Sequence, residues 1–179
     1  MTNSNYLRDL TAQTHMAAKN TALAQAMING TLTETQYHDL LFNMLAIFQT
    51  IENRLDAIPA SIKRVDKYRA DLATVTQKYS SLAVSTIQYI NYLDKLNSTQ
   101  VWAHAYVLYL GLMYGSQILS EVTPWLHTHL DFDNVKQSIA YIRANSTETE
   151  SEESNIAFQW IAKIYDELYN SVRADSVPA

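Results

Sequence analysis

The sequence contains no cysteine and only three glycines and three prolines among its 179 residues. Without cysteine there can be no disulfide framework and no catalysis by a thiolate. Glycine and proline are the strongest breakers of regular structure, and apolar residues recur here at three- and four-residue spacing, so we predict an all-α protein. We expect a single domain over residues 1–179, with a loose tail at 174–179.

Positive charge is also scarce. The chain has 13 Lys and Arg against 18 Asp and Glu, a formal net charge of -5 and a pI near 5.4. The basic footprint of a nucleic-acid-binding protein is therefore missing, and we expect no nucleic-acid partner. The N-terminal stretch MTNSNYLRDL lacks the charged-then-apolar pattern of a secretory signal, which favours a cytoplasmic protein. We also expect a monomer.

One long stretch, 101–119, carries no Asp, Glu, Lys or Arg and holds Gly111 and Gly115. Glycine inside a helix costs about 1 kcal/mol relative to alanine, so two of them on one helical face need a reason. The candidates are a closely packed neighbouring helix, a lipid-embedded contact or a flat ligand. His104, Gln117 and three tyrosines dilute the hydrophobicity of this stretch, and we therefore predict a buried central helix rather than a membrane span.

The apolar periodicity predicts the remaining helices. We expect them at about 6–29, 34–57, 131–143 and 156–172, with two or three shorter helices within 60–97 and a polar loop at 145–154. Gly30 is predicted to end the first helix, and Thr33 to Gln36 reads as a capping box that opens the second. Residues 97–99 are predicted to cap the central helix, and Thr123 with Pro124 to begin a further one.

Histidine is the main candidate for chemistry. A di-iron helical bundle would need Glu-x-x-His pairs, and that pattern is absent. We interpret His127 and His129 as surface residues, and His38 and His104, which have no evident partner in the sequence, as structural or exposed residues.

His15 differs because it lies within an apolar stripe of the first predicted helix. A histidine in this position is often only a hydrogen-bonded core residue. Combined with the glycine face of the central helix, however, it suggests a sandwich in which an imidazole ligates the iron of a planar macrocycle and bare backbone covers the other side. Arg8, Lys19 and Arg143 are then candidates to bind carboxylate tails of the ligand.

Two segments resemble the haem oxygenase family. The first, LRDLTAQTHMAAKNTALAQAMINGTLTETQYHDLL, is similar to the N-terminal segment of that family, and the second, AHAYVLYLGLMYGSQIL, resembles its distal helix. The last predicted helix keeps an aromatic pattern of the same kind from Phe158 to Tyr165. The resemblance covers nearly the whole chain.

The resemblance implies a helical bundle that holds haem between a proximal and a distal helix. His15 would be the proximal iron ligand, Gly111 and Gly115 would bring the distal helix close to the haem, and Arg8 and Arg143 would face its propionates. The implied reaction uses haem as cofactor and substrate: with O2 and electrons from ferredoxin, flavodoxin or an NADPH-dependent reductase, it yields biliverdin, carbon monoxide and ferrous iron.

The distal helix diverges from the family where protons are delivered. Leu112 stands where the family has an aspartate, and Phe48 and Leu108 replace a tyrosine and an arginine of the same network. Tyr114 replaces a small residue, and Lys19 takes the place of a glutamate that orients the proximal histidine.

Three functions remain open at this point. The first is a haem oxygenase with Leu112 in place of the aspartate. In that case water held at the glycines, or a hydroxyl of Tyr106 or Tyr114, supplies the proton. Alternatively, the protein carries or senses haem without degrading it. The third reading is a site for a different small molecule, as in the thiaminase-like relatives of this fold. The basic residues between Lys63 and Arg69 are either a docking patch for an acidic electron donor or a solvated helix face.

Overall fold

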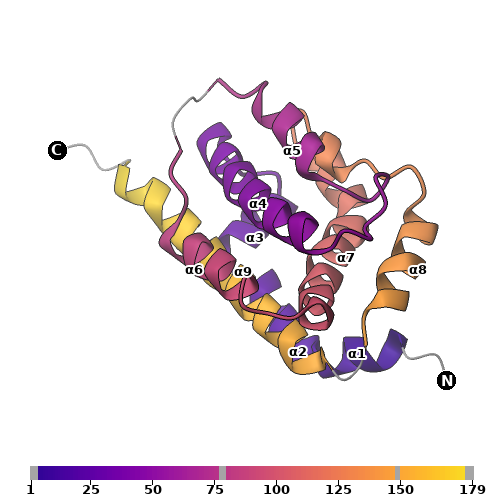
Figure 1. Cartoon of the computed structure of the whole chain (residues 1–179). Coiled ribbons are helices and arrows are strands. Elements are labelled where there is room, and N and C mark those ends of the chain that lie inside the picture. The colour runs from indigo at the N-terminus through magenta and orange to yellow at the C-terminus, as the bar shows by residue number, and fades with distance from the viewer. Residues whose placement is uncertain (1–3, 77–79, 148–149, 176–179) are drawn as a thin grey trace.

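The structure is a computed structural model that describes residues 4–76, 80–147 and 150–175. Every regular element in these ranges is helical, as predicted (Figure 1). The elements are α1 (Ser4–Leu10), α2 (Ala12–Lys19), α3 (Ala22–Ile28), α4 (Glu34–Arg54), α5 (Val65–Leu72), α6 (Val84–Leu93), α7 (Ser98–Val122), the 3-10 helix η1 (Thr128–Leu130), α8 (Val135–Asn145) and α9 (Ser151–Asp175).

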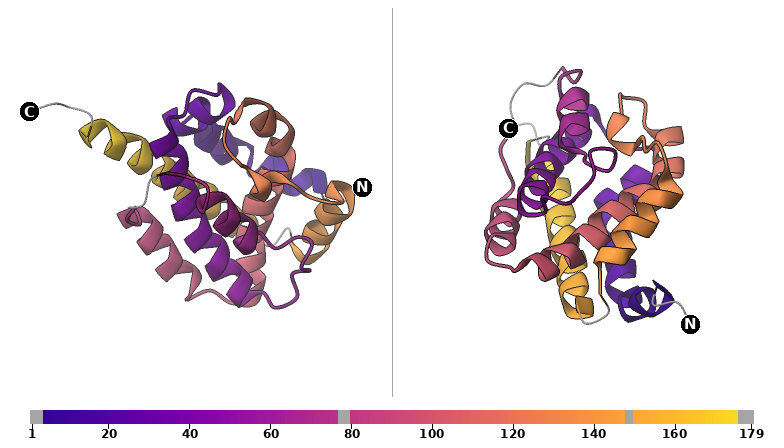
Figure 2. Two further views of the ribbon diagram at one scale, coloured as in Figure 1. Left: turned by 90° about the horizontal axis from the view of Figure 1, so that it is seen from above. Right: turned by 45° about the vertical axis from the view of Figure 1, so that its right-hand side comes forward.

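The long helices α4, α7 and α9 form the frame of the molecule. Helix α9 packs against α2, α3, α4, α6 and α7, so that the N-terminal and C-terminal segments of the chain lie side by side (Figures 1 and 2). Helix α7 also contacts α3 and α8. The first half of α7, residues 101–110, is buried throughout, whereas the second half is more open. This change along α7 marks the position of the site described below.

Two helix starts follow the predicted capping chemistry. The Thr33 hydroxyl accepts a hydrogen bond from the Gln36 backbone N–H, and the Gln36 side chain accepts one from the Thr33 N–H. Asn97 and Gln100 repeat the arrangement at α7. Gly30 has a φ of 64°, and a Cβ atom there would lie 3.1 Å from the Val122 Cβ. The turn before α4 therefore needs glycine, both for its backbone conformation and for its approach to α7.

The first predicted helix, 6–29, is wrong as a single element because the chain forms α1, α2 and α3 there. At the first break, the Thr11 hydroxyl donates to the Leu7 carbonyl 2.9 Å away. At the second, the Thr21 side chain caps α3 by accepting from the Ala24 N–H. Threonine side chains compete in this way for backbone groups and bend or interrupt helices.

The expectations for the later segments need four corrections. Thr123 ends α7 rather than beginning a helix, and Pro124 lies outside any helix. Helix α8 starts at Val135 because the Asn134 side chain accepts from the Gln137 N–H. The predicted loop 145–154 is shorter than expected, since α9 already begins at Ser151; residues 148–149 lie outside the described ranges. Of the expected tail, 174–175 belong to α9, and 176–179 are outside the described ranges.

The early start of α9 has a physical cause in Glu153. Its carboxylate accepts hydrogen bonds from the Tyr92 hydroxyl and the Gln100 amide, and lies 3.0 Å from Nε2 of His104. The other ring nitrogen of His104 is 2.7 Å from the Tyr89 hydroxyl. This polar cluster joins α6, α7 and α9. His104 is thus a fully buried structural residue with partners that are distant in the sequence.

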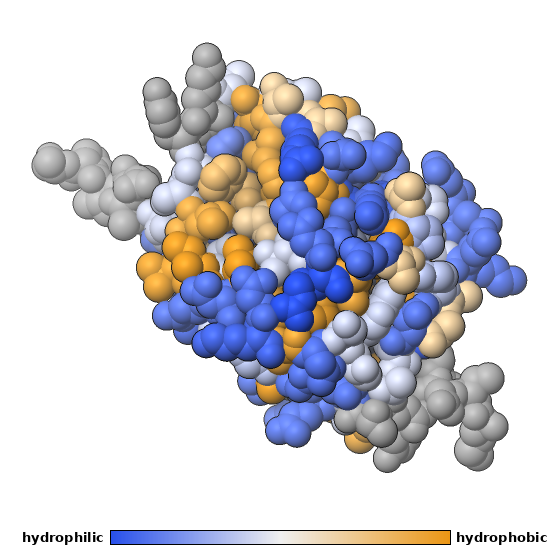
Figure 3. All heavy atoms as spheres, in the orientation of Figure 1, coloured by the Kyte–Doolittle hydropathy of each residue, from blue (hydrophilic) through white to orange (hydrophobic). Residues whose placement is uncertain are grey.

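Hydrophobic and hydrophilic side chains alternate over the face viewed in Figure 3. Among the described residues, no helix combines the length and the apolar character that crossing a bilayer requires.

Candidate functional site

A cavity of about 600 Å³ lies against α2, α3, α7 and α9. Its lining is mostly apolar, and it includes every site residue predicted from the sequence: Arg8, His15, Lys19, Phe48, Tyr106, Gly111, Leu112, Tyr114, Gly115, Arg143 and Phe158. These residues come from six different helices, α1, α2, α4, α7, α8 and α9. A volume of this size suits a large organic ligand.

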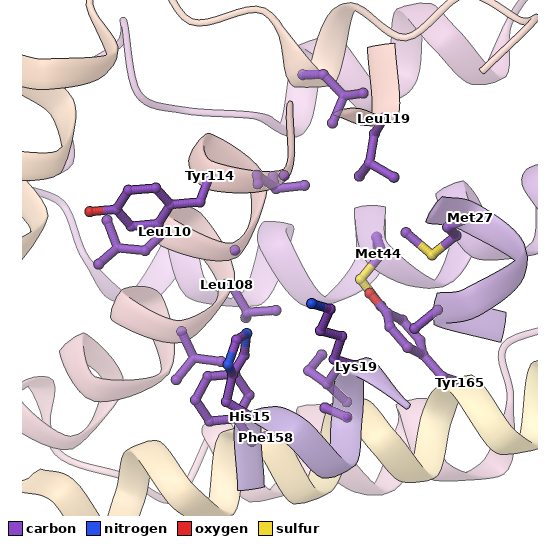
Figure 4. Close-up of a pocket in the computed structure, with 18 of the residues that line it drawn as sticks. His15, Lys19, Met27, Met44, Leu108, Leu110, Tyr114, Leu119, Phe158 and Tyr165 are labelled. Carbon is purple, nitrogen blue, oxygen red and sulfur yellow. The ribbon is translucent and has the colours of Figure 1, made fainter. Parts of the chain in front are cut away.

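His15 projects from α2 into this cavity (Figure 4). Its ring packs against the Phe158 ring, with 5.3 Å between the centroids and an interplanar angle of 57°. We find no hydrogen-bond partner for the imidazole within residues 4–76, 80–147 and 150–175. Partial burial lowers the pKa of His15 below 6.5, and the charge of Lys19 lowers it further. At neutral pH the ring is therefore uncharged and has a lone pair for a ligand.

The glycines of α7 explain why this side of the cavity is open. A Cβ atom built on Gly111 meets nothing within 4 Å, and one on Gly115 meets only the Leu119 side chain, at 3.4 Å. A neighbouring helix of the described chain therefore does not require glycine at either position. Of the explanations considered from the sequence, a ligand that approaches the α7 backbone fits the structure best.

One end of the cavity is positively charged. The Arg143 guanidinium donates a hydrogen bond to the Tyr114 hydroxyl 2.8 Å away, which fixes the arginine at the end of α8. Arg8 is exposed at the same end, since its charge and that of Arg143 both act on the Tyr106 hydroxyl. Burial nevertheless raises the pKa of Tyr106. This end is suited to carboxylate groups of a ligand.

The middle of the α7 wall is apolar. Leu108 and Leu112 line the cavity, and across from α7 the wall includes Phe48 of α4. The Phe48 ring packs against Tyr68 at 5.2 Å and edge-on against Tyr109 at 5.0 Å, which holds it in place. No acid occupies this part of the lining, so a ligand bound there receives no proton from a carboxylate of α7.

Tyr68, His129 and Tyr165 also line the cavity, and the sequence did not single them out as site residues. Tyr68 could have been found, because Val65, Tyr68 and Leu72 follow helical spacing and so share a face. The interpretation of His129 as a surface residue is wrong: it is only 6% exposed, and its Nδ1 lies 2.7 Å from an Asp71 oxygen. The 3-10 helix turns it inward, while His127 is half-buried with its Nδ1 beside the Trp125 carbonyl.

The basic segment contributes less to the surface than expected. Arg64 is only 2% exposed, and its guanidinium donates to the carbonyls of Ser61, Ile62 and Asp131. Exposed Arg69 pairs with Asp66 at 3.1 Å. Arg64 is therefore a structural residue and is not available to dock an acidic protein.

The described residues contain no group of three or more His, Cys, Asp or Glu side chains arranged to hold a metal ion. A single imidazole is sufficient for iron that a porphyrin already holds by four nitrogens. The accessible lone pair of His15, the open backbone at Gly111 and the two arginines therefore fit haem better than a bare ion.

These features describe a class of protein: a helical bundle with one large, mostly apolar cavity, whose lining includes an imidazole, an α7 face with two glycines and two arginines. Such a cavity is suited to a large, flat and anionic ligand. A family model described as Heme oxygenase matches residues 1–168. The chain belongs to the haem oxygenase family.

Individual relatives are distant in sequence and close in fold. A Heme oxygenase of Porphyra purpurea is 23% identical, with 94% of this chain and 87% of that protein covered. One of Rhodella violacea is 24% identical over 65% of this chain and 57% of the relative. The solved structure of heme oxygenase-2 from Synechocystis in complex with heme and NO has a TM-score of 0.85 at 21% identity, covering 98% of this chain and 88% of that one. The solved structure of heme oxygenase from Leptospira interrogans has a TM-score of 0.81 at 20% identity, covering 93% of this chain and 100% of that one. These structures confirm the predicted fold.

Proposed function

We propose that this protein is a haem oxygenase, which cleaves haem to biliverdin, carbon monoxide and ferrous iron. One observation carries the proposal: in a chain of this family, the accessible imidazole of His15 and the open backbone at Gly111 line one large apolar cavity. Bound haem would supply both the iron that activates dioxygen and the ring that is opened.

The residues of the cavity wall have separate tasks in this proposal. His15 binds the iron, and the Phe158 ring beside it fixes the plane of the imidazole. Partial burial disfavours protonation of the imidazole, and the charge of Lys19 disfavours it further. Arg8 and Arg143 bind the carboxylates of the ligand.

The second wall controls access to the reacting face of the ligand. Gly111 and Gly115 leave room for a small molecule and expose backbone groups at that face. Leu108, Leu112 and Phe48 keep it apolar, which limits the amount of water there. Tyr114 is held by Arg143, so its hydroxyl acts mainly in positioning that arginine.

Electrons have to come from outside, and we propose a ferredoxin, a flavodoxin or an NADPH-dependent reductase as the donor. We further propose that the chain acts as a single domain and as a monomer, since α2 and α9, from its two ends, pack on each other. Analytical ultracentrifugation of the hemin complex, alone and with each donor, tests both points.

The enzymatic proposal is tested by turnover. Purified protein loaded with hemin is given ferredoxin and its reductase, and biliverdin and carbon monoxide are measured. We expect both products from the wild type and neither from His15→Ala. If hemin binds through His15 and neither product forms, the protein is a haem carrier or sensor. If hemin does not bind, the cavity serves a different small molecule.

A further inference from the structure

Three tyrosines that line the cavity have a hydroxyl without a hydrogen-bond partner among the described residues. Tyr106 lies near Arg8 and Arg143, at the positively charged end, whereas Tyr68 and Tyr165 belong to other helices. Tyr68, on α5, is 1% exposed, and Tyr165 comes from α9. Both line the cavity, and Figure 4 shows the Tyr165 hydroxyl pointing into it beside Met44. Across the part of the chain that the structure describes, we find no protein group bonded to either hydroxyl. Tyr68 is buried and Tyr165 is partly buried, and because both line the cavity, water there can satisfy hydroxyls that would otherwise stay unpaired at a cost in free energy.

Tyr68 and Tyr165 both keep their protons, and Tyr165 contributes to this at Tyr68. Burial raises the pKa of Tyr68 well above 10.0, and Tyr165 raises it further. Burial raises the pKa of Tyr165 to about 12. Each therefore presents an O–H that can donate to a water molecule in the cavity.

His129 adds an acceptor next to these donors. Its ring stacks on Tyr68, with 4.6 Å between the centroids and 22° between the planes. Although burial opposes a charge on Asp71, hydrogen bonds from His129 and Thr128 keep the pKa of this carboxyl below its usual value. An ionised Asp71 takes its hydrogen bond from Nδ1–H of His129, 2.7 Å away. This assigns the proton to Nδ1 and leaves the lone pair on Nε2.

Burial also lowers the pKa of His129 below 6.5, in spite of Asp71, so the ring is neutral at neutral pH. Asp71 orients it further through the backbone: its carboxylate accepts from the N–H groups of Thr128 and His129, at 2.8 and 2.9 Å. The carboxylate thus fixes both the tautomer and the direction of the imidazole.

The position of this cluster matters because the α7 wall offers no acid. Leu112 and Leu108 are apolar, and the hydroxyls of Tyr114 and Tyr106 lie with Arg143 at the charged end of the cavity. Arg8, Arg143, Tyr106 and Tyr114 form the charged end, and Thr11, His15 and Lys19 lie on the side of α2. The other polar side chains of the lining, Tyr68, His129 and Tyr165, belong to α5, η1 and α9. From this arrangement we propose that Tyr68, Tyr165 and His129 bind ordered water inside the cavity and supply protons to the ligand there. We call these three residues the tyrosine–histidine wall.

In this step, each proton given to the ligand is replaced by one from solvent. A proton passes from the bound water to the ligand, the tyrosine hydroxyls and His129 Nε2 realign their hydrogen bonds to that water, and a proton from solvent restores it. No residue of the wall is permanently charged or oxidised. The delivery of protons rests on the proposed function, whereas the binding of water does not.

The first experiment needs no haem. Crystals of the wild type and of Tyr68→Phe and Tyr165→Phe, grown without hemin, are compared at a resolution that shows water. We expect at least one water within hydrogen-bonding distance of both hydroxyls in the wild type, and its loss in the double variant. A wild-type crystal structure with no ordered water bound to the Tyr68 and Tyr165 hydroxyls would overturn the proposal.

The second experiment measures the C–O stretch of the ferrous hemin complex with bound carbon monoxide, by infrared spectroscopy. A hydrogen-bond donor near the oxygen of carbon monoxide lowers this frequency. We therefore expect Tyr68→Phe and Tyr165→Phe to raise it. Tyr37→Phe is the matched control: that buried hydroxyl donates to the Leu126 carbonyl at 2.7 Å and does not line the cavity. A frequency that none of the variants changes contradicts the proposal.

The third readout is the rate of biliverdin formation. Because a positioned acid contributes on the order of 100-fold or more, we expect the Tyr68→Phe, Tyr165→Phe double variant to lose about that factor. His129→Asn keeps a donor to Asp71 but removes Nε2, and we expect a slower reaction with unchanged hemin affinity. An unchanged rate in both variants would refute proton delivery. If the wild type binds hemin without turnover, the proposed function and proton delivery are both wrong. The position of water and the C–O stretch then still test whether the tyrosine–histidine wall binds water.

Discussion

Lys19 follows His15 by one helical turn on α2, and its charge adds to partial burial in lowering the pKa of the His15 imidazole. A lysine at this place works against protonation of His15, whereas an acidic neighbour would favour it. Partial burial and the charge of Lys19, rather than a hydrogen bond, therefore favour the uncharged imidazole, which can act as a ligand.

The first prediction concerns this pair. Lys19→Ala removes the repulsion, so the pKa of His15 rises, and Lys19→Glu raises it more. Histidine signals in an NMR pH titration of the ligand-free protein give both values. Lys136→Ala is the control, because Lys136 of α8 is exposed and does not line the cavity. The electrostatic account of His15 is wrong if Lys19→Glu leaves its pKa where it was.

The second prediction separates stability from function at Gly111. Alanine in place of glycine favours a helix by about 1 kcal/mol, and the added Cβ atom meets nothing within 4 Å. Gly111→Ala therefore raises the free energy of unfolding by about 1 kcal/mol in urea denaturation of the ligand-free protein. Hemin affinity falls, because the methyl group occupies ligand space. A destabilised Gly111→Ala protein, or one that binds hemin as tightly as the wild type, contradicts this role.

The third prediction concerns the carboxylates of the ligand. Loss of one charge-assisted hydrogen bond costs about 1.5 kcal/mol, so Arg143→Met should weaken hemin binding by about tenfold. Hemin dimethyl ester, which lacks the free carboxylates, should bind the variant and the wild type equally well. Tyr114→Phe removes the group that Arg143 bonds to, and it should give a smaller loss in the same titration. Equal losses with hemin and with its ester would place Arg143 away from the carboxylates.

The fourth prediction follows from the buried histidines. Burial lowers the pKa values of His104 and His129 below 6.5, so the unfolded chain binds protons that the folded chain does not. Stability is therefore lost as the pH falls below 6.5, by up to about 1.4 kcal/mol per pH unit for each histidine. Urea denaturation at a series of pH values measures this slope, which should be smaller in His129→Asn. A slope of the opposite sign would contradict the direction of both pKa shifts.

The sequence predicted the helical fold and picked out residues that line one cavity, because both depend on local patterns. Apolar periodicity located α4, α7 and α9, and the glycine pair and His15 indicated the cavity wall. The breaks around α2 were missed, because the Thr11 and Thr21 hydroxyls compete with helix hydrogen bonds in a way that periodicity does not register.

The rest of the site could not be predicted, since it depends on contacts between distant segments. Asp71 and His129 are 58 residues apart, and only the fold brings them within hydrogen-bonding distance. Tyr68 of α5 and Tyr165 of α9 are far apart in the sequence, and the fold places both in the lining of one cavity. Arg64 looked like part of a basic surface, but carbonyl groups from two segments bury it.

The most direct test of the account is the absorption spectrum of the hemin complex, because the central claim is that His15 ligates haem in the cavity. We predict a histidine-ligated Soret band for the wild type, its loss in His15→Gly, and its recovery when imidazole is added to the variant. His127→Gly, outside the cavity lining, should keep the wild-type spectrum. A His15→Gly protein whose hemin spectrum matches the wild type without added imidazole would contradict the account.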